Sequence, residues 1–366
     1  MKKLTFLISV ALVSTILFNS CGSKNGAENG DDKKVAGRKI DPKLDSLITA
    51  MAACEQQNTN CEGYNKASVG IQAMSKDAAN KTLAEDLFNA ISQSTNNKRS
   101  AACAHAINFW LGSSAHLENA AYGKVILDAL KKEKFDQSSY VGSTLGQLLA
   151  GWLSSNDEAL LKELHAAVAN KSTESRGRLE LIRLSGDKSF EKNGYLDVLI
   201  NIAKDAAEDE AVKRQVLAVI WRVKDAAHIQ KVEDLYISLL DNESAVVSGA
   251  AMEGLGYMKS AKGFAKVLES VEKKGADEKY ASSTARALTN YLTGDAKEGI
   301  DKEKALAFAI KMSGNKTLKA YSRSAYVYSI ESYGGAKAKA ALTKLAASSE
   351  KEIADPAKQA LTRIKK

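Results

Sequence analysis

The sequence contains almost no proline and few aromatic residues. Only Pro42 and Pro356 occur among its 366 residues, and aromatic side chains make up 6% of the chain. No run of alternating β-branched residues with turn punctuation indicates a sheet. Alanine, leucine and lysine are abundant, and these residues favour helix, whereas proline breaks it. The sequence therefore predicts a chain that is helical nearly throughout.

Long apolar runs are also lacking, except at the N-terminus. Two lysines, at positions 2 and 3, precede an apolar stretch over residues 4–18. This stretch is short for a membrane-spanning helix, which needs about 20 residues. A positively charged start followed by a short apolar core is typical of an export signal.

The apolar stretch ends at Cys21, within the letters FNSCG. This ending resembles the lipobox of bacterial lipoproteins, although Phe18 and Asn19 stand where that pattern usually has leucine and then alanine or serine. The resemblance implies a signal peptide over 1–20 and a covalent lipid on Cys21, with no other cofactor. The alternative is an ordinary secretory signal with an incidental cysteine.

Residues 21–43 are rich in glycine, asparagine, aspartate, lysine and serine, so we expect the lipidated cysteine to be followed by a flexible polar tether. Residues 44–366 would then form the folded body. Gly22 is not the aspartate of an inner-membrane retention signal, which favours the outer membrane within the cell envelope. Removal of the two N-terminal lysines lowers the formal charge from +8 to about +6. Export argues against nucleic acid as the partner of this mildly basic chain.

Two of the four cysteines lie close together in the sequence. Cys54 and Cys61 flank a short polar run, and in an oxidising compartment they are a natural disulfide pair. Closing so short a loop would contribute roughly 2–3 kcal/mol. A zinc site is the rival, but no CxxC motif or nearby histidine supports it. Cys103 lies on an apolar helical stretch, where we expect a buried free thiol.

The helical segments repeat along the chain. One apolar residue in every second helix recurs at intervals of 34–39 residues, which indicates a stack of helix pairs sharing a continuous core. The recurring residues are Ile71, Ile107, Leu145, Leu181, Leu217, Met252, Leu288, Val327 and Leu361. The first helices are expected at 44–53, 83–94, 116–132, 157–169, 193–206, 228–241, 262–274, 301–313 and 336–348.

One repeat resembles a known family. From Asp241 to Gly256, an Asp-rich turn, two valines, two alanines and a Leu-Gly ending resemble the second helix of a HEAT repeat. The resemblance is good over 228–292 and implies an all-α, right-handed superhelix of about nine helix pairs. Ser248 departs from it, because the family usually has arginine there. A tetratricopeptide array has a similar period, but its signature residues are missing.

The chain lacks the motifs of enzymes and metal sites. Its four histidines fall in separate repeats, and no HExxH, Walker or GxGxxG pattern occurs. Residues 142–146 superficially resemble a nucleophile elbow with threonine for serine, but that turn requires a preceding strand. We therefore expect neither a catalytic residue nor a bound metal, and no enzymatic activity.

Aromatic and basic residues gather on the second helices, which line the concave face of HEAT-like solenoids. Such residues are over-represented in binding hot spots. The alternative is that the tryptophans fill gaps between repeats and the basic residues are merely solvated. The candidate concave surface comprises Trp110, Trp152, Arg178, Arg183, Lys213, Arg214, Trp221, Arg222, Tyr257, Arg286, Tyr291 and Arg323.

These features together predict a membrane-anchored envelope lipoprotein that acts as a non-enzymatic scaffold for another envelope protein. A lipoprotein that binds glycan, peptidoglycan or another anionic polymer is the first alternative. A purely structural envelope spacer is the second. The fold alone does not decide between them.

Intact mass spectrometry of the membrane-extracted protein tests both features of the N-terminal region. We expect a chain that begins at Cys21 with added acyl mass and that gains the mass of two hydrogens on reduction. An unmodified chain cut at another position would contradict the lipid anchor, and an unchanged mass on reduction would contradict the disulfide.

Overall fold

The structure is a computed structural model, and all its described residues belong to one unit, Val35–Lys366. The predicted signal peptide, the predicted lipid site at Cys21 and most of the predicted tether lie outside the described residues. The described residues are 39–54, 60–77, 80, 82–94, 96–111, 120–132, 144–150, 158–184, 190, 192, 194–295 and 297–364.

The described part of the chain consists of helices joined by turns, without a strand. The helices alternate as first and second members of successive pairs. The first helices are α1 (Pro42–Ala52), α3 (Leu83–Gln93), α5 (Ala120–Lys132), α7 (Glu158–Ala169), α10 (Tyr195–Lys204), α12 (Ala226–Leu239), α14 (Ala261–Lys274), α16 (Lys302–Ser313) and α18 (Gly335–Ala346). The second helices are α2 (Glu62–Lys76), α4 (Asn97–Trp110), α8 (Ser175–Leu184), α11 (Glu210–Ile220), α13 (Ala245–Met258), α15 (Glu278–Leu292), α17 (Ala320–Tyr333) and α19 (Lys351–Arg363), and residues 144–150 are also helical.

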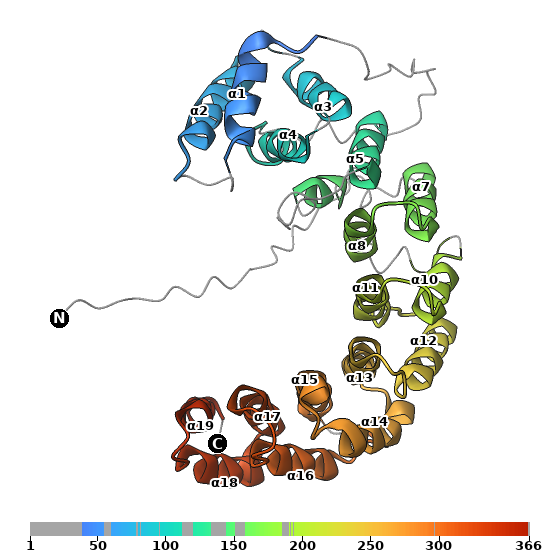
Figure 1. Ribbon diagram of the computed structural model, residues 1–366, viewed down its shortest axis with the longest axis vertical. Coiled ribbons are helices and arrows are strands. Elements are labelled where there is room, and N and C mark those ends of the chain that lie inside the picture. The colour runs from blue at the N-terminus through green and yellow to red at the C-terminus, as the bar shows by residue number, and fades with distance from the viewer. Residues whose placement is uncertain are drawn as a thin grey trace, which may run out of the picture. The chain divides into compact units, whose positions relative to one another are not determined.

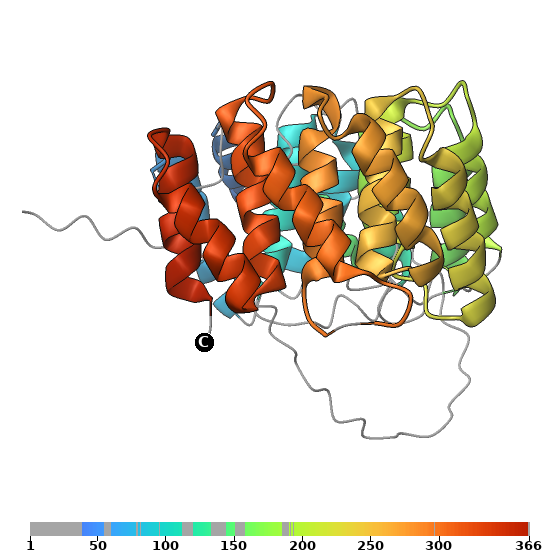
Figure 2. The same ribbon diagram turned by 90° about the horizontal axis from the view of Figure 1, so that it is seen from below.

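The pairs stack in two layers (Figure 1). In the second-helix layer, each of α8, α11, α13, α15, α17 and α19 contacts the next, while α7, α10, α12 and α14 do the same in the first-helix layer. Figure 2 shows the consecutive helices of the C-terminal half lying side by side. The predicted all-α repeat is confirmed. Eight of its nine recurring residues, Ile71, Ile107, Leu145, Leu181, Leu217, Met252, Leu288 and Val327, are each at most 2% exposed. The ninth, Leu361, is partly buried.

Small residues let neighbouring second helices approach closely. A Cβ atom on Gly249 would lie 2.6 Å from Oγ of Ser283, and one on Gly256 would lie 2.9 Å from the carbonyl oxygen of Ala287. Both distances are shorter than carbon and oxygen atoms tolerate without a shift, so α13 requires glycine on the side that faces α15.

Buried cations satisfy carbonyl groups at the ends of the first helices. Arg178 Nε donates to the carbonyl oxygen of Val168 at 3.0 Å, and its two terminal nitrogens each donate to the Glu208 carboxylate at 2.9 Å. These donations hold the pKa of Glu208 below its usual range. Both side chains are almost fully buried, so the pair depends on its own hydrogen bonds for compensation.

The repeat with Ser248 obtains its cation from another helix. Ser248 Oγ donates to the carbonyl oxygen of Leu240 at 2.6 Å, and Lys274 Nζ donates to Ser248 Oγ at 3.0 Å and to the same carbonyl. Lys274 is the last residue of α14. A lysine from the next first helix therefore provides the positive charge that the HEAT pattern places on the second helix itself.

The first helix pair is closed covalently. The Asp41 side chain caps α1 by accepting from the backbone nitrogens of Lys43 and Leu44. At the other end of α1, a disulfide joins Cys54 to Cys61, whose Cα atoms are 6.1 Å apart, and Cys61 directly precedes α2. The bond therefore links the end of one helix to the start of the next.

Among the described residues, no helix is both long and apolar enough to cross a membrane.

Arg178→Ala should destabilise the fold by about 3–5 kcal/mol, because it leaves the Glu208 carboxylate buried without its partner. The free energy of unfolding is measured by urea denaturation with circular dichroism. Replacing Arg178 and Glu208 together by methionine should restore much of the loss, since no charge is then stranded. Because the pKa of Glu208 is depressed in the folded state, its contribution should be present at neutral pH and disappear as pH falls through that depressed value.

Arg183→Ala provides the control, because this arginine is exposed and pairs with Glu180 one helical turn away on the surface. An Arg178→Ala variant that unfolds at the same urea concentration as the Arg183→Ala variant would contradict a structural role for the buried pair.

Candidate functional site

Some of the predicted surface residues belong to the core. The prediction chose them by residue type and did not separate the buried side of each second helix from its open side. A buried side chain cannot form a binding surface, so this part of the prediction is wrong. Trp110, Arg178, Lys213, Tyr291 and Arg323 are each at most 9% exposed.

These buried residues have partners within the fold. Lys213 Nζ donates to the carbonyl oxygen of Ala206 at 3.4 Å, and the Tyr291 hydroxyl donates to that of Ser260 at 3.2 Å. Arg323 pairs with Glu350. They therefore connect helices within and between neighbouring repeats.

Six other candidates are described and not fully buried: Arg183, Arg214, Trp221, Arg222, Tyr257 and Arg286. Trp152 lies outside the described residues. Four of the six line a single groove across α11, α13 and α15: Arg214, Trp221, Tyr257 and Arg286. Arg183 lies on α8, where it pairs with Glu180 at 2.7 Å.

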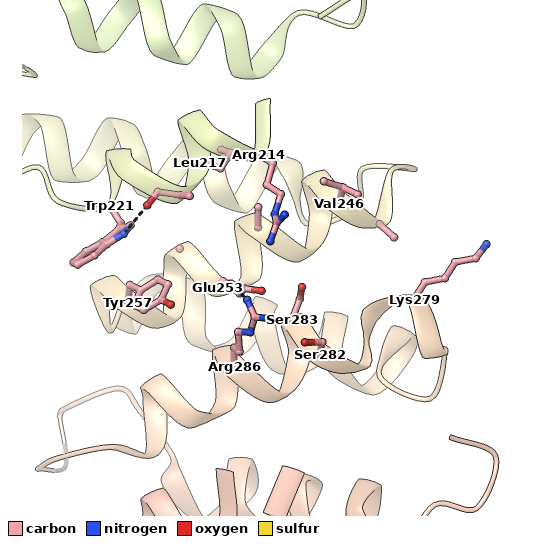
Figure 3. Close-up of a pocket in the computed structure, with 14 residues that line it drawn as sticks. Arg214, Leu217, Trp221, Val246, Glu253, Tyr257, Lys279, Ser282, Ser283 and Arg286 are labelled. Carbon is pink, nitrogen blue, oxygen red and sulfur yellow. Dashed lines mark hydrogen bonds and ion pairs between the residues drawn. The ribbon is translucent and has the colours of Figure 1, made fainter. Parts of the chain in front are cut away.

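The groove has a volume of about 560 Å³ and is built from three consecutive second helices (Figure 3). Arg214 and Trp221 come from the α11 segment, Val246, Glu253 and Tyr257 from α13, and Lys279 and Arg286 from α15. In Figure 3, the side chain of Arg214 points from α11 toward α13. The close packing of second helices thus brings together residues that are far apart in the sequence.

An aromatic pair forms one end of the groove. The rings of Trp221 and Tyr257 are stacked, with centroids 5.0 Å apart and planes inclined by 20°. Trp221 Nε1 donates to the carbonyl oxygen of Ala218 at 3.0 Å, which fixes the indole without an external partner. Tyr257 is nevertheless 44% exposed. The pair therefore presents an ordered apolar surface at the opening of the groove.

The charges that line the groove are unequal. Arg214, Lys279 and Arg286 are basic, and Glu253 is the one carboxylate among the lining residues. Arg286 pairs with Glu253 at 3.4 Å. Within the described part of the chain, neither Arg214 nor Lys279 has a carboxylate at ion-pair distance. The groove consequently carries a net positive charge.

A second, smaller hollow adjoins the first. It has a volume of about 360 Å³ and is also lined by Trp221 and Tyr257. Arg222 and Lys224 add positive charge, and no carboxylate is among the lining residues. The Arg222 guanidinium lies 5.8 Å from the ring centroid of Phe190. The aromatic pair thus borders two basic hollows, the second of which extends over the turn after α11 to Ile229 of α12.

The sequence prediction missed several lining residues. Val246, Ala250, Glu253 and Tyr257 follow one another at intervals of four, three and four residues, which is the spacing of one helical stripe. Extending that spacing from Tyr257 back along the helix would have found the first three. The prediction considered only aromatic and basic types, so it overlooked valine and glutamate, and it also missed Lys279 on α15.

The described residues contain little that suggests reaction chemistry. Burial raises the pKa of Cys103 to about 12, which leaves its thiol protonated at neutral pH. Burial lowers the pKa of His165 to about 4, and its ring stacks on Tyr195 at 3.7 Å between centroids. No group of three potential metal ligands occurs in the described ranges. The groove offers surfaces for binding, whereas these two titratable groups are core residues.

No known family model matches the sequence, and no curated protein matches it either. Solved structures resemble the fold. Kap121p bound to Pho4p aligns with a TM-score of 0.50 at 11% identity, over 87% of this chain and 37% of that one. Kap121p bound to Nup53p gives a TM-score of 0.49 at 11% identity with the same coverage, and an engineered protein gives 0.42 at 17% identity, with 88% of each chain covered.

The fold is a HEAT-like helical-repeat solenoid. At 11% identity, the likeness to Kap121p concerns the fold alone, and this chain spans 37% of the length of that protein.

Replacing a buried and a surface tyrosine distinguishes residues that pack the core from residues that form the groove. Tyr291→Ala should cost about 3–5 kcal/mol, as for other large buried aromatic residues. Tyr257→Ala should cost less than about 1 kcal/mol, because this residue is 44% exposed and lies on the surface. Thermal unfolding of both variants, followed by circular dichroism, checks the contrast. Equal losses would mean that Tyr257 is a core residue and the aromatic surface is structural.

Proposed function

We propose that this protein is a non-enzymatic scaffold that binds another protein through the open face of its second helices. The observation that carries the proposal is the distribution of exposed large apolar side chains. Val69, Phe109, Val246, Tyr257, Tyr321 and Tyr328 lie on second helices, and Ile310 alone lies on a first helix among the described residues. Exposed apolar groups concentrated on one face mark interaction surfaces.

The first-helix face has a different character. Ion pairs connect successive repeats there, such as Lys231 with Asp197 at 3.1 Å and Lys337 with Glu303 at 2.7 Å. Surface pairs of this kind add little stability, but they neutralise charge locally. Among the described residues Ile310 is the one exposed large apolar side chain on a first helix, so a partner that seeks apolar contact would prefer the second-helix face.

The proposal includes a place in the cell. A lipid on Cys21 and a polar segment after it would hold the scaffold at a membrane of the cell envelope, with the outer membrane preferred. What supports this part is the sequence of residues 2–22. A lipid anchor would keep the binding face near a membrane while leaving it free to meet envelope proteins.

One alternative has a specific observation behind it. Stacked aromatic rings beside arginines also suit a glycan or another anionic polymer, and Trp221 and Tyr257 provide such rings. Valine and alanine side chains line the same groove, and these offer a sugar or a phosphate chain little to bind. We therefore favour a protein partner.

Site-specific photo-crosslinking in the native cells distinguishes these possibilities. A benzophenone side chain at Tyr257 should give a discrete protein adduct, because this position lies on the proposed face. The matched control places the same group at Ile310, which is 37% exposed on α16 of the first-helix layer. The adduct should be absent there and weakened by Arg214→Glu with Lys279→Glu.

Equal adducts at both positions would refute the choice of face. An adduct that resists protease but not glycosidase would support the glycan alternative. No adduct at Tyr257 would favour a structural spacer.

A further inference from the structure

The groove across α11, α13 and α15 has room for a particular kind of segment. Packed helices lie about 8–10 Å apart, so the path from α11 to α15 is roughly 20 Å long. An extended chain rises about 3.3 Å per residue, and about six residues would cross it. This is a short linear segment rather than a folded surface.

The lining residues alternate in chemistry along that path. Arg214 on α11 and Lys279 on α15 are exposed cations with no carboxylate at ion-pair distance in the described part of the chain. Between them, Val246 and Ala250 of α13 provide apolar contact. Glu253 is already engaged by Arg286. A matching ligand therefore brings negative charge to the edges and apolar side chains to the middle.

The stacked Trp221 and Tyr257 extend this apolar contact. Both residues line the groove and the adjoining hollow, so one side chain of a ligand can lie against the pair from either side. The hollow adds Arg222 and Lys224 to the basic lining. Aromatic and arginine side chains together form the commonest hot spots of protein interfaces.

We propose that the groove binds an extended, acidic segment of a partner protein, with carboxylates at Arg214 and Lys279 and an apolar side chain on Trp221 and Tyr257. This inference rests on the proposed function and specifies its ligand. Charge complementarity argues for the acidic character. The apolar lining argues against a uniformly charged polymer, which would leave Val246 and the two rings without contacts.

Fluorescence anisotropy with defined peptides tests the ligand class on the full mature chain in detergent. The probe is a short fluorescein-labelled peptide of alternating glutamate and phenylalanine. It should bind, and its affinity should fall as salt is raised, because charge pairs at exposed residues are screened. A version with lysine for glutamate, and one with serine for phenylalanine, should each bind at least about tenfold more weakly.

Charge-reversed variants show whether the groove itself is responsible. Arg214→Glu with Lys279→Glu should weaken the acidic probe by about tenfold or more and should gain affinity for the lysine version. The matched control is Lys162→Glu with Lys311→Glu, on α7 and α16. These two lysines are also exposed and without an ion pair among the described residues, and their reversal should change the affinity less than about twofold.

Several outcomes would overturn the inference. If the lysine version binds the unaltered chain as well as the acidic probe does, charge complementarity fails. If the serine version or inorganic polyphosphate binds equally well, the aromatic pair is not used and the site takes polyanions. If no peptide binds while crosslinking at Tyr257 still captures a protein, the ligand class is wrong but the proposed function stands.

Discussion

The packing of each second helix against the next is the contact on which the rest of this structure depends. It requires small residues at the seam, such as Gly249 and Gly256 opposite α15. With α11 and α15 on its two sides and the first helix α12 behind it, α13 keeps one stripe open, and that stripe lines the groove. Residues at matching heights on α11, α13 and α15 then meet across the seams, which is how a groove forms from side chains that belong to three separate repeats.

Two cations at the ends of first helices stabilise the same arrangement. Arg178 and Lys274 reach carbonyl oxygens of Val168 and Leu240 that the first helices leave without partners at their ends. A buried charge is costly unless it is fully hydrogen-bonded, so the buried Arg178 favours the one helix spacing at which all its hydrogen bonds form. The partly exposed Lys274 adds a contact of the same kind. Apolar packing alone would tolerate small slips between repeats, whereas these contacts do not.

The repeat itself could be predicted from the sequence, because apolar residues such as Leu217 and Met252 recur at a nearly constant interval and must be buried in the core. Neighbouring residues on a helix differ by about 100° in direction, and this rotation defeated the choice of site residues. Lys213 is buried whereas Arg214, the next residue, is exposed. Ser248 stands where the HEAT pattern has arginine, and Lys274 of another helix takes over its contact. Nothing in the sequence around Ser248 indicates this replacement.

The covalently closed first hairpin has a mechanical consequence. A pull on the chain before Asp41 acts on α1 at its N-terminal end, where the cap and the contacts with α2 and α4 resist it. The helix can peel away turn by turn, but the chain stops lengthening at Cys54, because the disulfide passes the force directly to Cys61. The residues between the two cysteines are shielded from tension, and α2 must then be unseated for the chain to extend further.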